Sequence, residues 1–174
     1  MYFAPKIVRP LAATETGLLP HNLINPYHIC KDKPEKEVDL SKIRLVLPIN
    51  MGSGKFVLPD EIGQTALEQN ARELGAIGSL GLLKELLQAI EKGEGDFPRR
   101  DEWGEIWKIF FPLTIIHRPN FSVVYGQYYN VLLRRNPYSS TDRWEADLDR
   151  PWFGLARHYL NEWRIMVIDP KPSA

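Results

Sequence analysis

The chain has 174 residues, of which 44% are hydrophobic and 25% charged, and this composition excludes an intrinsically disordered protein and fits one globular body. Its 22 basic and 22 acidic residues cancel, so no overall field draws the chain to nucleic acid or to an anionic membrane, and such binding would need a local patch. One cysteine, Cys30, excludes an intrachain disulfide, and no apolar run approaches the roughly 18 residues of a membrane span. These features predict a soluble, cytoplasmic protein that does not contact membranes.

The first 42 residues predict an extended, proline-rich arm. They contain five of the 14 prolines and show no sustained hydrophobic period, so they cannot form a core of their own. We expect this arm to bury Tyr2, Phe3 and Ile7 against the body or a partner, and to expose Lys31 to Lys42 as a charged hinge. Residues 43–174 are then a single α+β domain.

Residues 43–59 predict a β-hairpin, because two similar apolar runs, LVLP and FVLP, flank a glycine-containing loop. The loop reads Gly-Ser-Gly-Lys over 52–55 and raises the alternative of a phosphate-binding loop. That motif requires glycine where Ile49 stands and a hydroxyl side chain where Phe56 stands. The turn of a hairpin is therefore the better interpretation.

Apolar residues at helical spacing predict most of the remaining body. Capping residues and glycines favour helices over 60–74 and 79–92, a short one over 101–110, and a last one that begins near Pro151. The runs LTII and RIMVID predict strands. The expected fold is therefore α+β, a predominantly helical body with a small antiparallel sheet and a long irregular N-terminal arm.

Residues 120–136 fit either a helix or a hairpin. A hairpin would turn at Gly126-Gln127, whereas a polar stripe at helical spacing and the helix-ending Asn136-Pro137 favour a helix. We take the helix as the prediction.

Aromatic residues are concentrated late in the chain, with 14 of 19 after position 100, and several lie beside arginine. Both residue types are enriched at protein interfaces and in grooves that bind single-stranded nucleic acid. Those with helical spacing, such as Trp103 and Trp163, are expected in the core. The candidates for contact with a partner lie in one polar connection: Arg134, Arg135, Tyr138, Arg143 and Trp144.

Acidic residues in the same connection favour a protein over a phosphate partner. Three carboxylates alternate with other residues and would share one face of a strand, as a metal site requires: Glu145, Asp147 and Asp149. Carboxylates that stabilise the N-terminus of a following helix are a commoner explanation of such residues. His158 and Glu162 are four apart, which suits two metal ligands or a solvated pair. No motif supports a metal, and none is predicted.

The sequence contains few candidate catalytic residues. Cys30 lacks neighbours that would activate a thiol, and His117 ends an apolar run, where backbone-bonded histidines are commoner than catalytic ones. No nucleophile elbow and no dinucleotide-binding motif is present in the sequence. The sequence therefore weighs against an enzyme, and no cofactor and no catalytic residue is predicted.

The leading hypothesis is a non-enzymatic interaction or assembly protein, which binds another copy or a partner subunit through its arm and its aromatic and arginine-rich surface. One alternative is an accessory nucleic-acid-binding protein that uses the same arginines together with Tyr138 and Trp144. The other is a small enzyme with His117 or His158 as acid or base.

Overall fold

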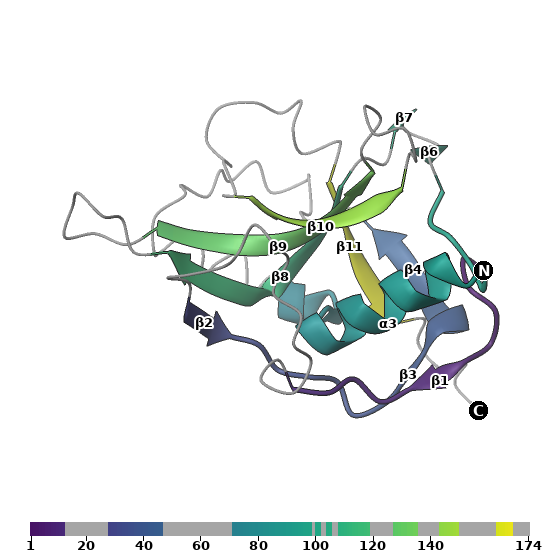
Figure 1. Ribbon diagram of the computed structural model, residues 1–174, viewed down its shortest axis with the longest axis horizontal. Helices are drawn as coiled ribbons and strands as arrows, with labels where there is room; N and C mark the ends of the chain where they lie inside the picture. The colour runs from purple at the N-terminus through teal and green to yellow at the C-terminus, as the bar shows by residue number, and fades with distance from the viewer. Residues whose placement is uncertain are drawn as a thin grey trace.

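The computed structural model describes residues 1–12, 28–46, 71–98, 100–101, 104–105, 108–118, 127–135, 143–149 and 163–168. Of the residues that can be interpreted, 41% lie in strands and 24% in helices. The prediction of a predominantly helical body is therefore wrong, because the body is built on a multi-stranded sheet with one long helix across it (Figure 1).

Strand β8 (Lys108–Arg118) is the central element of the main sheet, whose order is β10-β9-β8-β11-β4. Strands β9 (Gln127–Arg135) and β10 (Trp144–Asp149) follow it as an antiparallel meander. Two strands share its other edge: β11 (Trp163–Ile168) runs parallel to Lys108–Phe110, and β2 (His28–Lys31) runs antiparallel to Ile115–His117. Strands β4 (Ile43–Val46) and β5 (Ala76–Ile77) pair with β11.

A bulge interrupts β8 where the two strands on its shared edge meet. Phe111 pairs with Val131 and Ile115 with Asn130, so Pro112, Leu113 and Thr114 have no partner in β9. Proline has no N–H to offer a neighbouring strand, which suits it to such a position. Bulges re-aim side chains and are frequent beside functional sites.

Helix α3 (Leu80–Glu91) packs its apolar face against the sheet (Figure 1). The predicted helix over 79–92 is confirmed: Ser79 caps it by accepting from the Leu82 N–H at 3.1 Å, and Leu82 and Leu86 are buried. The chain leaves the helix through Gly93, whose φ of +72° is open to glycine at no steric cost.

Two other predicted helices are wrong where the structure describes them. The segment 101–110 contains β6 (Arg100–Asp101), β7 (Gly104–Glu105) and the start of β8. The segment 120–136 contains β9, which also includes the Gln127 that the hairpin alternative placed in the turn. Burial explains the first error: Ile109, Phe110 and Phe111 are all buried, as in a strand covered on both faces, and such a run has no period to read.

The strands predicted from LTII and RIMVID are confirmed as parts of β8 and β11, and the first run of the predicted hairpin, LVLP over 45–48, is strand as far as Val46 in β4. Strand β4 pairs with β11, and the expected hairpin partner, FVLP, lies outside the described residues. The predicted helix over 60–74 is described only at its end, where helical residues 71–73 lead to Gly75 with φ +74°. The Gly-Ser-Gly-Lys loop and the helix expected from Pro151 lie outside the described residues.

The start of the arm is fastened to the body at Phe3, which is 2% exposed and forms a bridge with Gly95. The Ala4 N–H donates to the Glu94 carbonyl at 2.9 Å, and the Phe3 ring meets the Phe97 ring edge-on at 4.9 Å. A Cβ on Gly95 would lie 2.6 Å from the Phe3 Cα, so this approach requires glycine.

The rest of the arm differs in part from the expectation. Strand β1 (Ile7–Val8) pairs with β3 (Val38–Asp39) and buries Val8, whereas Ile7 is 61% exposed, so its expected burial is wrong. The region 31–42 is not an exposed hinge throughout, because Val38 and Leu40 are buried in the core. Beyond β3 the chain makes the 3-10 turn η2 (Leu40–Lys42), capped by Asp39.

We predict that Phe3→Ala lowers the free energy of unfolding by about 3–5 kcal/mol, because it leaves a cavity against Phe97. Ile7→Ala, in the same arm but exposed, should change it by less than about 0.5 kcal/mol. Urea unfolding of both variants followed by circular dichroism measures the difference. Equal effects would show that the arm contributes nothing specific to the core.

We also predict that Asp39 makes stability depend on pH. Hydrogen bonds from the Ser41 hydroxyl at 2.7 Å and the Ser41 N–H at 3.0 Å lower the pKa of Asp39 below its ordinary 3.8. The stabilisation is then fully present above pH about 3.8 and is lost as the pH falls through the lower pKa of the folded state. The difference in unfolding free energy between the unaltered protein and Asp39→Asn should therefore shrink on acidification, and a difference independent of pH would contradict this role.

Candidate anion-binding site

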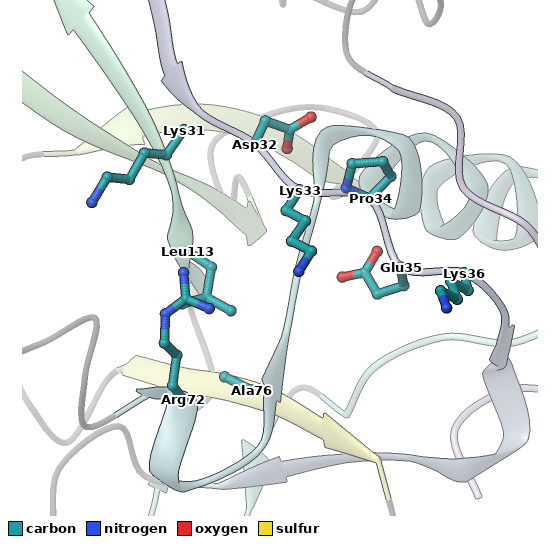
Figure 2. Close-up of a pocket in the computed structure, with 9 residues that line it drawn as sticks. All are labelled: Lys31, Asp32, Lys33, Pro34, Glu35, Lys36, Arg72, Ala76 and Leu113. Atoms are coloured by element: carbon teal, nitrogen blue, oxygen red, sulfur yellow. The ribbon is translucent and has the colours of Figure 1, made fainter.

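A cleft of about 620 Å³ lies between the segment that follows β2 and the bulge of β8 (Figure 2). Its described lining falls into three chemical groups. The cations are Lys31, Lys33, Lys36 and Arg72; the carboxylates are Asp32 and Glu35; the apolar residues are Pro34, Ala76 and Leu113. Six of these nine residues are consecutive in the sequence, from Lys31 to Lys36, and so belong to the arm.

The carboxylate of Glu35 holds the start of helix α3. One oxygen accepts a hydrogen bond from the Gly78 N–H at 2.7 Å, and the other accepts from the Ser79 hydroxyl at 2.6 Å. A helix N-terminus carries unpaired N–H groups and partial positive charge, so a carboxylate there is doubly favoured. Glu35 is thus a structural ligand of the helix end.

Asp32 binds the same helix end and the bulge of β8. Its Oδ1 accepts from the Leu80 N–H at 2.9 Å and lies 3.2 Å from the Thr114 hydroxyl, and its Oδ2 is buried from solvent. The Thr114 hydroxyl is closer to the Gly78 carbonyl, at 2.8 Å. Residues 32–35, the start of α3 and the bulge are therefore joined in one polar cluster.

The cations of the described lining, unlike its carboxylates, are exposed to solvent. Lys31, Lys33, Lys36 and Arg72 are all exposed, and neither Lys33 nor Lys36 forms an ion pair with any other residue that the structure describes. The described lining, with four cations and two carboxylates, has a formal charge of +2 in a chain whose net charge is zero. Both oxygens of Glu35 and the Oδ1 of Asp32 are bound at the helix end, whereas the cations are exposed, so the solvent side of the described lining suits an anion.

Three of the residues predicted to bind a partner make contacts within the protein. The Trp144 side chain is 4% exposed; its Nε1–H donates to Asp96 at 2.8 Å and its ring meets Phe97 edge-on. Arg135, with a side chain 13% exposed, pairs with the other Asp96 oxygen at 3.6 Å. The half-buried Tyr2 ring also lies near Phe97, so the buried Phe97 and the exposed Asp96 are the common partners of these side chains.

The other predicted contact residues are not brought to the cleft. Arg143 is exposed beside Glu145, 4.0 Å away, at the start of β10. Arg134 lies in β9, opposite Lys108 in β8 and Glu145 in β10. Tyr138 lies outside the described residues. None of the predicted site residues is in the described lining of the cleft, and the part of the arm that lines it, residues 31–36, was predicted to be a charged hinge.

The histidines weighed for catalysis are partly placed. His117 in β8 lies opposite His28 in β2 and Tyr128 in β9, and His158 falls outside the described residues. Within the part of the chain that the structure describes, no three His, Cys, Asp or Glu side chains are grouped to hold a metal ion.

The sequence signal for the cleft was the charged run from Lys31 to Lys36, which we interpreted as a solvated hinge. Its alternation of lysine with acid gave no indication that the acids face a helix end. Arg72 and Leu113 carried no signal, because only the fold brings them beside that run.

No family model, curated protein or solved structure matches the chain, so its function is inferred from these side chains alone. Among the described residues, no helix is both long and apolar enough to cross a membrane.

We predict that Glu35→Gln destabilises the protein by about 1.5–3 kcal/mol, because it weakens two hydrogen bonds to a charged acceptor at the start of α3. Glu37→Gln is the matched control, since Glu37 makes only an exposed ion pair with Arg9, and it should cost less than about 1 kcal/mol. Urea unfolding of both variants measures this. Equal losses would show that Glu35 does not anchor the helix.

Proposed function

We propose that this protein is a non-enzymatic interaction protein that binds an acidic segment of a partner protein in the cleft. One observation carries the proposal: among the described residues that line the cleft, the lysines and the arginine are exposed, while Asp32 and Glu35 are bound to the start of helix α3. The cleft includes residues 31–36 of the arm, so the proposal keeps the arm as the binding segment and moves the contact away from Trp144.

The chemistry of the lining favours binding over catalysis. Asp32 and Glu35, the carboxylates of the described lining, are held by hydrogen bonds at the helix end and are not placed for proton transfer to a ligand. The Ser79 hydroxyl is buried and caps the helix, so it is no nucleophile. Exposed lysines supply charge and little orientation, which suits a multivalent anion.

A protein partner fits this cleft better than nucleic acid. Single-stranded nucleic acid is usually held by aromatic rings on which the bases stack, and the described lining contains none. Of the two aromatic residues in the nucleic-acid hypothesis, Trp144 is buried against Phe97 and Tyr138 lies outside the described residues. An acidic peptide needs only positive charge and a modest apolar surface, and the cleft offers both.

We predict that poly-L-glutamate binds the unaltered protein at low salt and that the double variant Lys33→Glu with Lys36→Glu binds it at least about tenfold more weakly, since both changes reverse charge at the cleft. Fluorescence anisotropy with labelled poly-L-glutamate measures the affinity, which should fall as salt is added.

The control is Lys42→Glu with Lys92→Glu, which changes the net charge equally at exposed positions outside the described lining. It should retain most of the affinity. Equal weakening in both variants, no binding at low salt, or tighter binding of a single-stranded oligonucleotide than of poly-L-glutamate would overturn the proposal.

A further inference from the structure

Leu113 is an apolar side chain that the bulge of β8 presents to the cleft. Its neighbours on both sides, Phe111, Pro112, Thr114 and Ile115, are buried, whereas Leu113 is only half-buried and lines the cleft. The three residues of the bulge have no partner in β9, so Leu113 is not held in the regular alternation of the sheet. In the described lining, Leu113 is thus the leucine that a ligand beside the cations can contact.

The surroundings of Leu113 are held firmly. Thr114, the next residue, donates to the Gly78 carbonyl at 2.8 Å, and Ala76 belongs to β5, which pairs with β11. Ala76 and Pro34 are half-buried and extend the apolar part of the lining. The described lining therefore combines half-buried apolar side chains, two of them on strands β5 and β8, with exposed cations.

The cations of the described lining stand around Leu113. In Figure 2 Lys31 lies to the left of Leu113 and Lys33 and Lys36 lie to its right, whereas the Arg72 side chain is drawn across Leu113 from below. A ligand that satisfies both sides carries carboxylates at two places, and the part between them lies over Leu113. An aliphatic side chain at that place removes apolar surface from water on both partners.

We infer that the acidic segment carries an aliphatic side chain between flanking carboxylates, and that this side chain packs on Leu113. This inference rests on the proposed function and names the sequence class of the partner segment. Charge brings the segment to the cleft, and contact with Leu113 selects among acidic segments of equal charge.

The test uses three synthetic peptides of equal length. One has a central leucine flanked by glutamates, the second has a central serine flanked by glutamates, and the third has a central leucine flanked by glutamines. On the unaltered protein, the leucine-centred acidic peptide should bind about 3- to 10-fold more tightly than the serine-centred one, as burial of part of a leucine side chain implies.

Two protein variants complete a double-mutant cycle. Leu113→Ser should abolish the advantage of the leucine-centred peptide, whereas Leu11→Ser, at an exposed leucine outside the described lining, should preserve it. Isothermal titration calorimetry measures all affinities. If Leu113→Ser does not fold, the comparison of the peptides on the unaltered protein decides the inference.

The outcomes separate the two proposals. If both acidic peptides bind equally well to the unaltered protein and the glutamine peptide does not bind, the inference is overturned and the proposed function stands. The inference is also overturned if the advantage of leucine survives Leu113→Ser. If neither acidic peptide binds better than the glutamine peptide, the proposed function fails, and the inference fails with it.

Discussion

The hydrogen bonds from the start of helix α3 to two carboxylates are the interaction on which the rest of the structure depends. Asp32 and Glu35 accept from Leu80, Gly78 and Ser79, and these contacts fix the arm to the helix that covers the sheet. Thr114 joins the bulge of β8 to the same cluster. A helix end buried without such partners would leave costly unpaired N–H groups, so the segment that lines the cleft also completes the fold.

This arrangement separates charge within a chain that has none overall. If all the side chains along residues 31–36 faced solvent, two carboxylates would offset two of the three lysines. Since the acids face the helix end, the lysines remain as a positive surface, and Arg72 adds to it from a distant part of the sequence. Net charge therefore says little about a local patch, because the fold decides which charges reach the solvent.

The accuracy of the sequence predictions follows the range of the interactions that form each element. Helix α3 was predictable because its cap at Ser79, its apolar spacing and its stop at Gly93 lie within one short segment. Strand β9 was missed because its polar residues also fit a helix, and pairing with β8 decided between them. The charged residues 31–36 stood out in the sequence, but the sequence did not indicate which of their side chains bind the helix end and which reach solvent. The position of Leu113 could not be predicted, because it depends on a bulge that only the pairing of β8 with β9 defines.

Residue type alone also did not predict which aromatic and arginine side chains make contacts within the protein. Tryptophan and arginine are enriched where proteins meet, yet here Asp96 binds Trp144 and Arg135 within the protein, and Phe97 packs beside the tryptophan ring. The cleft presents mainly lysine, which is depleted in the cores of interfaces. Exposed lysines raise association rates more than they raise affinity, and by themselves they discriminate poorly between partners of equal charge. If the cleft binds an acidic segment as proposed, specificity comes from the apolar part of its lining, where the bulge presents the half-buried Leu113.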